Sequence, residues 1–135
     1  MTPDFHAEKA NRISASMKKL RDNDYEGVIE ASMLAGTHWL NFARHQLKFA
    51  GAEHDVMHAE YLDGVQRVKI QLLAPHLLAA LDEIEGHRAG YVRGDLNGGE
   101  RIAARCRHLL EQIRDIATKV TPLKPSPDAG PRPPA

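Results

Sequence analysis

Apolar residues recur at alternating intervals of three and four positions along most of this chain, which is the period of an amphipathic α-helix. The clearest run lies toward the C-terminus and consists of Ile102, Cys106, Leu109, Ile113, Ile116 and Val120. No segment shows the two-residue alternation that is typical of a half-buried β-strand. We therefore predict an all-α protein that folds as an up-and-down bundle of four to five helices.

Capping residues, glycines and prolines set the ends of the expected helices. The helices should cover about residues 2–21, 25–50, 55–73, 77–91 and 97–120. Asn23 with Glu26, and Asn97 with Glu100, have the spacing of a capping box at the start of the second and the last helix. Pro75 should separate the third helix from the fourth, because proline disfavours helical geometry in the residue before it.

The second helix should be the central one, because two adjacent apolar stripes run along residues 25–50. That apolar arc is wider than one four-helix core usually covers in so short a chain, and we therefore predict a homodimer. The third helix is predicted on a single apolar stripe, which consists of Met57, Tyr61, Val65, Val68 and Leu72.

The last fifteen residues, 121–135, contain six prolines and no apolar periodicity. Such a composition is typical of an extended, disordered tail. The expected organisation is thus one helical bundle domain over residues 1–120, followed by a disordered Pro-rich tail.

The 18 basic and 18 acidic side chains cancel, so the whole chain has no net attraction for nucleic acids or membranes, and a basic site must be local. Cys106 is the only cysteine, which excludes an internal disulfide and suits a reducing cytoplasm. No stretch approaches the roughly 18 apolar residues of a membrane span. We expect a cytoplasmic protein that does not bind membranes.

Two groups of histidine-containing residues are candidate sites among the eight histidines of the chain. His54 and His58 have the i, i+4 spacing that lets two imidazoles share a metal ion on one helical face, and the neighbouring Glu53 or Asp55 could add a carboxylate. His38, Asn41 and His45 share a face of the second helix and could line a polar groove. The alternative for both groups is a helix face that only contacts water, with His38 partly buried beside Trp39 in the second group.

A basic stripe on the last helix is the candidate site for phosphate. It includes Arg101, Arg105 and His108, and Arg88 and Arg93 from the preceding segment could join it. The alternative is that these cations pair with surface carboxylates. The chain has no Gly-rich phosphate loop, nucleophile elbow or HExxH sequence, and we expect no cofactor.

The order of three segments resembles the HEPN superfamily of small helical proteins, named for nucleotide binding in higher eukaryotes and prokaryotes. The segments are the Ala-rich residues 25–40, the histidine-bearing residues 54–58 and the Arg- and Tyr-containing residues 85–91. The resemblance implies a bundle of four or five helices, frequent dimerisation through the long helices, and roles in toxin–antitoxin or nucleotide-linked systems.

Active ribonucleases of that superfamily carry an arginine, four to six intervening residues and a histidine, with a polar residue after the arginine. Arg101 and His108 meet the spacing, but Ile102 stands where the polar residue is expected. The resemblance therefore implies a non-catalytic or divergent interaction module that binds a partner protein or the phosphate of a nucleotide or RNA. The alternatives are a metal-independent ribonuclease that uses Arg101 and His108, and a bundle whose histidines bind a metal.

Overall fold

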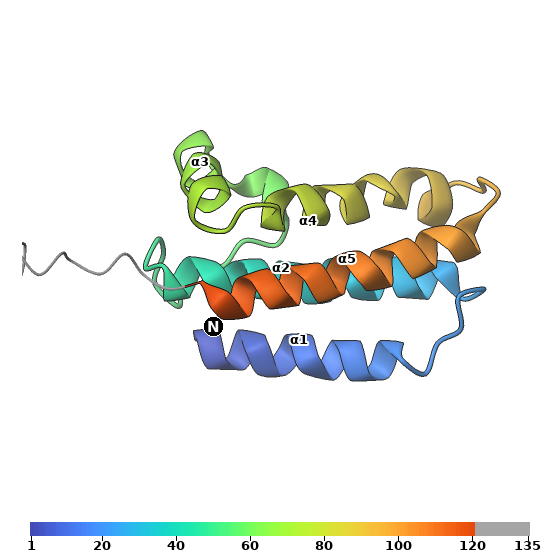
Figure 1. The fold of residues 1–135 in the computed structure, drawn as a ribbon, viewed down its shortest axis with the longest axis horizontal. Helices are drawn as coiled ribbons and strands as arrows, with labels where there is room; N and C mark the ends of the chain where they lie inside the picture. Colours follow the sequence, from blue (N-terminus) through green and yellow to red (C-terminus); the bar gives the residue numbers. More distant parts are fainter. Residues whose placement is uncertain (121–135) are drawn as a thin grey trace, which may run out of the picture.

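The computed structural model describes residues 1–120 and contains five α-helices and two short helical turns (Figure 1). The α-helices are α1 (Pro3–Met17), α2 (Tyr25–Gln46), α3 (Gly64–Leu73), α4 (Leu77–Gly86) and α5 (Gly99–Lys119), and the turns are η1 (Ala59–Tyr61) and η2 (Arg88–Arg93). Within residues 1–120 there is no β-strand, so the predicted all-α bundle is confirmed. The predicted Pro-rich tail, 121–135, lies outside the described residues.

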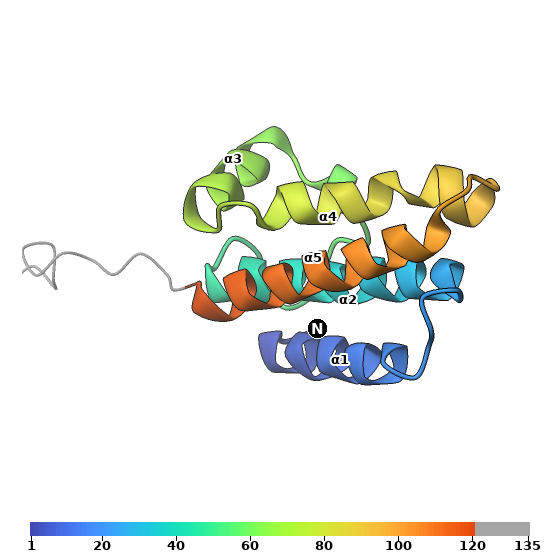
Figure 2. The same cartoon turned by 45° about the vertical axis from the view of Figure 1, so that its right-hand side comes forward.

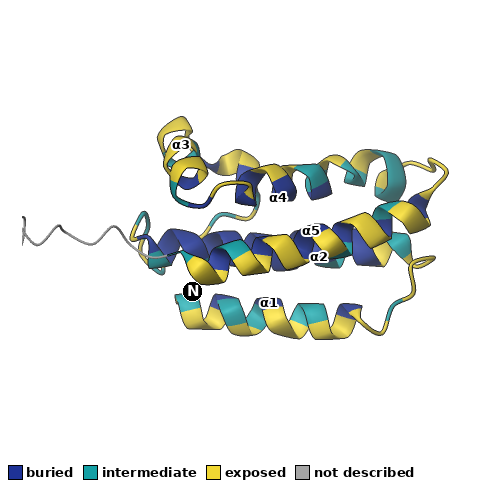
Figure 3. Ribbon diagram, in the orientation of Figure 1, coloured by how far each residue is buried: buried dark blue, intermediate teal, exposed yellow. Residues whose placement is uncertain are grey.

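The helices pack around α2, which contacts α1 on one side and α4 and α5 on the other (Figures 1 and 2). Both apolar stripes of α2 are buried within the chain, as the 0% exposure of Val28, Ile29 and Leu40 shows (Figure 3). The unused apolar surface on which we based the dimer prediction is therefore not present on α2. In residues 1–120, no helix combines the length and the apolar character that crossing a bilayer needs.

Local signals placed some helix ends correctly and others wrongly. Helix α1 begins as predicted, since the Thr2 hydroxyl accepts a hydrogen bond from the Phe5 N–H at 3.4 Å. The two predicted capping boxes are wrong, because α2 and α5 begin after Asp24 and Gly98, neither of which caps through its side chain. Gly98 has a φ of 90°, a conformation that glycine adopts without strain.

The third helix begins nine residues later than predicted. Asp63 caps it by accepting a hydrogen bond from the Gln66 N–H at 2.7 Å, and residues 51–63 form a loop that contains η1. The break at Pro75 is confirmed, with His76 in the left-handed region at a φ of 73°. This long loop matters for the site below, because it folds back against the end of α2.

Candidate metal centre

Three elements meet at one end of the bundle. Because α1 and α2 run antiparallel, the first turns of α1 lie beside the last turns of α2, and the loop after α2 returns to the same place (Figure 1). His6 comes from α1, His45 from α2 and Asp55 from the loop. The fold thus brings together residues that are 39 and 49 positions apart in the sequence, counting from His6.

The Asp55 carboxylate is shared by the two imidazoles. Its Oδ1 atom lies 2.8 Å from His6 Nε2 and 2.7 Å from His45 Nε2, and the two rings stack with centroids 5.3 Å apart. The histidine side chains are only 2% and 3% exposed, whereas the carboxyl side chain is 33% exposed. One nitrogen from each ring and one carboxylate oxygen therefore converge, all within 4.8 Å of one another, at a point open to solvent on the side of Asp55.

The second nitrogen of each imidazole is also held. His45 Nδ1 lies 2.9 Å from the Ala50 carbonyl oxygen, and His6 Nδ1 lies 2.9 Å from His38 Nδ1. A ring nitrogen bonded to a carbonyl must carry a proton, so Nδ1 of His45 is the donor to Ala50 and Nε2 is the atom that faces the cluster. This outer hydrogen bond is the one that metal-ligating histidines almost always make.

The hydrogen bonds of His45 show which of its nitrogens is available to a metal ion. Both of its partners, the Ala50 carbonyl and the ionised Asp55 carboxylate, only accept hydrogen bonds. Nδ1 is engaged with the Ala50 carbonyl, so Nε2, which faces Asp55, is the nitrogen of His45 that is available to a metal ion. Asp55 and His45 are thus hydrogen-bonded to each other and are candidate ligands of the same ion.

Asp55 is held in its ionised form. Partial burial acts to raise its pKa, but hydrogen bonds from His45, His6 and the N-terminal amine outweigh that effect and lower the pKa to about 2. Burial also lowers the pKa of His6 below its usual value, in spite of the bond to Asp55, which favours the neutral imidazole. An ionised carboxylate and a neutral imidazole are the forms that bind metals.

Two buried residues of α2 hold the loop around Asp55. The Asn41 side chain donates to the Val56 carbonyl at 2.8 Å and accepts from the Val56 N–H at 2.9 Å. Arg44 donates to the His54 carbonyl at 2.8 Å and to the Asn41 side chain at the same distance. The backbone is therefore fixed on both sides of Asp55, which keeps the carboxylate in place.

The predicted groove of His38, Asn41 and His45 takes a different form. Asn41 and His45 are buried, so the alternative of a face exposed to water is wrong for them, whereas His38 is half-buried as that alternative expected. The three residues do not line an open groove. Each of them instead supports the cluster. His45 is a candidate ligand, Asn41 holds the loop through Val56, and His38 is hydrogen-bonded to His6.

The other histidine prediction, a shared metal on one helical face, is wrong for His54 and His58. Both residues lie in the loop before η1 and not on a helix. His54 is 71% exposed beside Glu53, and His58 Nδ1 lies 3.1 Å from the Glu85 carboxylate on α4. The i, i+4 spacing therefore does not direct the two rings to one point.

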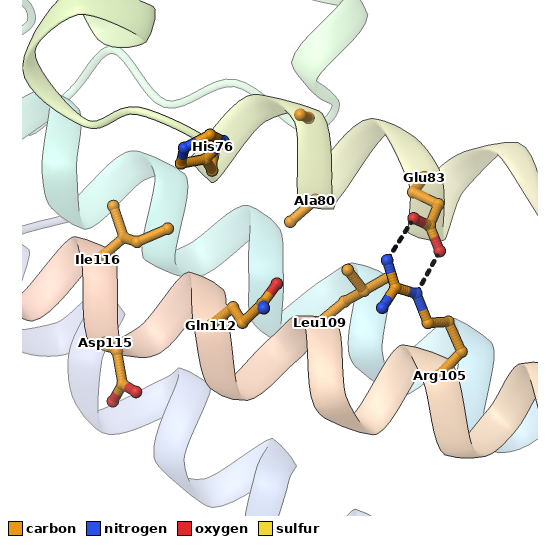
Figure 4. A pocket seen from close by; sticks show the side chains of 9 residues that line it. His76, Ala80, Glu83, Arg105, Leu109, Gln112, Asp115 and Ile116 are labelled. Atoms are coloured by element: carbon orange, nitrogen blue, oxygen red, sulfur yellow. Dashed lines mark hydrogen bonds and ion pairs between the residues drawn. The ribbon is translucent and has the colours of Figure 1, made fainter.

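Arg101, Arg105 and His108 lie on one exposed face of α5, as predicted, while Arg88 and Arg93 belong to η2. Two of these cations are engaged in ion pairs. Arg88 Nε lies 2.6 Å from the Glu30 carboxylate. Arg105 Nε and Nη2 each donate to one oxygen of the Glu83 carboxylate at 2.9 Å (Figure 4). Much of the positive charge on this face is therefore already balanced.

A groove of about 530 Å³ lies between α4 and α5 beside this ion pair (Figure 4). Its polar lining combines Glu83 and Asp115 with Arg105, His76 and Gln112, and its floor is apolar. Because two carboxylates oppose one guanidinium, the groove does not concentrate the positive charge that a phosphate needs.

His6 is the residue that the sequence patterns did not reveal, because it is isolated in the first helix and has no spacing relation to another ligand. Asp55 and His45 both belonged to candidate groups, but to two different ones. No protein-family model, curated protein or solved structure matches this chain, so the geometry of its side chains is the basis for a functional proposal.

Proposed function

We propose that this protein binds a divalent first-row transition metal ion through His6 Nε2, His45 Nε2 and the carboxylate of Asp55. The observation that carries the proposal is the convergence of these three donor atoms, with each imidazole fixed by a further hydrogen bond at Nδ1. Two imidazoles with one carboxylate form a common donor set for zinc and for non-haem iron.

The chemistry of the donors narrows the class of metal. Imidazole nitrogens favour Zn²⁺, Fe²⁺, Ni²⁺ or Cu²⁺ over Mg²⁺ and Ca²⁺, which prefer oxygen ligands. Three protein ligands leave at least one coordination position for water, on the side where Asp55 is exposed. The Asp55 oxygen and each imidazole nitrogen would move apart by roughly 0.5–0.9 Å from hydrogen-bond distance, because tetrahedral metal–ligand bonds of about 2.0–2.2 Å hold their ligands about 3.3–3.6 Å apart.

A bound ion would also cross-link the fold. It would join α1, α2 and the loop after α2 at the end of the bundle, and whatever binds only the folded state stabilises that state.

Calorimetric titration with Zn²⁺ after removal of metals by EDTA tests the proposal. We expect one ion per chain, and we expect His45→Gln to weaken binding by at least about 100-fold, since a ligand is lost. The matched control is His54→Gln, which removes a histidine that is 71% exposed and should leave binding unchanged. Equal affinity in the wild-type protein and the His45→Gln variant would rule the centre out.

We further propose that the protein acts as a homodimeric interaction module of the non-catalytic or divergent HEPN-like kind, in the cytoplasm, for a partner protein or an RNA or nucleotide phosphate. The support is the exposed face of α5 with Arg101, Arg105 and His108. Arg105 is paired with Glu83, so phosphate binding at this face would depend mainly on Arg101 and His108. The ribonuclease alternative predicts EDTA-resistant cleavage of single-stranded RNA that His108→Ala abolishes.

A further inference from the structure

The hydrogen bond between His6 on α1 and His38 on α2 joins two atoms of the same kind. His6 Nδ1 lies 2.9 Å from His38 Nδ1, and the ring centroids are 5.2 Å apart. Burial lowers the pKa of both rings, which favours their neutral forms. A neutral imidazole has a proton on one nitrogen and a lone pair on the other. One of the two Nδ1 atoms must therefore donate and the other must accept, and the distance allows either direction.

Asp55 determines the direction of this bond when no metal is bound. His6 Nε2 lies 2.8 Å from Asp55 Oδ1, and the pKa of this carboxyl is about 2, so the carboxylate is ionised and can only accept. His6 must donate to it from Nε2. The neutral ring then has no proton on Nδ1, so the bond between the two histidines runs from His38 to His6.

A metal ion on His6 Nε2 requires the opposite direction. The ion binds the lone pair of Nε2, so the proton of a neutral His6 must lie on Nδ1. His38 Nδ1 must then accept this proton in a hydrogen bond, and the proton of His38 itself must lie on Nε2. The distance between the rings can stay the same while the donor and the acceptor exchange roles.

We infer that His38 is a positioning residue that lets His6 change from a hydrogen-bond donor into a metal ligand, by reversing the direction of the bond between their Nδ1 atoms. The inference rests on the metal centre proposed above and assigns how one of its ligands is prepared. It requires that the two imidazoles exchange tautomers, with His6 changing from Nε2–H to Nδ1–H and His38 from Nδ1–H to Nε2–H.

The protons balance in this exchange. His38 gives its Nδ1 proton to His6 and takes one from water on Nε2, while His6 loses its Nε2 proton to water as the ion binds. The pair therefore holds two protons before and after. His38 Nε2 can exchange with water, because it has no hydrogen-bond partner within residues 1–120 and is not one of the buried polar atoms there. The His6 side chain, at 2% exposure, depends on His38 for its Nδ1 proton.

Comparison with His45 shows why a histidine suits this position. His45 Nδ1 faces the Ala50 carbonyl, which can only accept a hydrogen bond. A carbonyl in the place of His38 would hold the proton of a neutral His6 on Nδ1, and the Nε2 lone pair would face the Asp55 carboxylate whenever the metal is absent. His38 can donate or accept with the same atom, so it satisfies His6 in both states.

Long-range proton–nitrogen correlation NMR of the full chain tests the inference, because it distinguishes protonated from unprotonated ring nitrogens. Spectra recorded above the usual histidine pKa of 6.5 compare the EDTA-treated protein with the protein carrying one equivalent of Zn²⁺. We expect the His38 proton on Nδ1 without zinc and on Nε2 with zinc, and the reverse change in His6. The ring of His108, exposed on α5, should keep its tautomer and serves as the internal reference.

Zinc affinity of two His38 variants provides a second test. His38→Leu removes both the donor and the acceptor, and we expect it to weaken Zn²⁺ binding by about 10–100-fold, the usual effect of losing an outer partner of a ligand. His38→Asn places an amide where Nδ1 lies, which can donate or accept after rotation, and should bind nearly as tightly as the wild type. The control is His87→Leu, at another half-buried histidine, which should leave the affinity unchanged.

The outcomes separate this inference from the metal centre itself. Zinc bound at His6 Nε2 with no change in the His38 tautomer would overturn the inference and leave the centre standing. Equal losses of affinity in His38→Leu and His38→Asn, with helices retained by circular dichroism, would show that the ring only fills space and would also overturn it. No zinc binding by the wild-type protein would overturn both.

Discussion

His45 has a position in which a proton and a metal ion compete for one atom. Its Nδ1 proton is fixed by the Ala50 carbonyl, so only Nε2 can change its partner. Without metal, Nε2 donates a proton to Asp55, and with metal the lone pair of Nε2 binds the ion. The same hydrogen bonds therefore hold the two side chains in place and prepare the ligands for a metal.

The metal-free protein should lose stability in two steps as the pH falls. Burial lowers the pKa of His6 and of His38 below the usual 6.5, so the unfolded chain takes up protons first, and stability falls as the pH drops below 6.5. The pKa of Asp55 is about 2 in the fold against an ordinary 3.8, so its contribution is present above 3.8 and is lost between 3.8 and 2.

Urea unfolding across this pH range measures both steps, and Asp55→Asn isolates the second. The variant lacks the carboxylate, so its free energy of unfolding should change less between pH 3.8 and 2 than that of the wild type. We expect the difference to be on the order of 1 kcal/mol, because Asp55 is partly solvated. Parallel curves in that range would show that the hydrogen bonds to Asp55 add no stability.

Which residues form the site was only partly predictable from the sequence. His45 and Asp55 stood in polar groups that the spacing within a helix made visible. His6 became a neighbour only through the packing of α1 on α2, a contact between positions 39 residues apart that no local pattern encodes. His54 and His58 show the opposite error, a site predicted where none forms. Their i, i+4 spacing brings two side chains together only on an α-helix, and no α-helix forms at these residues.

Among the elements, the existence of the helices was predictable, because the apolar period is a local feature of the sequence. The residues at which the helices begin and end were less predictable. Helix α5 follows its stripe from Gly99 to Lys119, but its predicted capping box at Asn97 is replaced by Gly98 in a left-handed conformation. Helix α3 keeps only the part of its predicted range after the Asp63 cap. Ends depend on how the adjoining loop packs, which one sequence does not reveal.

Two glycines at helix ends should respond oppositely to alanine. At Gly99, the first residue of α5, a Cβ atom would lie 2.4–2.6 Å from three ring atoms of Tyr25, so Gly99→Ala should destabilise the fold by about 1–3 kcal/mol. At Gly86, the last residue of α4, a Cβ atom would meet nothing within 4 Å, so Gly86→Ala should stabilise it by about 0.4–1 kcal/mol.

Urea denaturation of the two glycine variants beside the wild type provides the comparison. A neutral Gly99→Ala would mean that the Tyr25 ring moves aside without cost. A destabilising Gly86→Ala would mean that this exposed position needs the flexibility of glycine.

At the scale of the whole molecule, the antiparallel pairing of α1 and α2 determines where the candidate metal ligands lie. It brings the start of α1, the end of α2 and the loop after α2 to one end of the bundle (Figure 1). His6, His45 and Asp55 meet there.

Anomalous diffraction at the zinc absorption edge, from crystals grown with Zn²⁺, tests the central claim most directly. We predict a peak within about 2.0–2.2 Å of His6 Nε2, His45 Nε2 and an Asp55 oxygen, with the Nδ1 contacts to His38 and Ala50 retained. A peak between His54 and His58 only, or no peak at the cluster in fully loaded protein, would contradict the assignment.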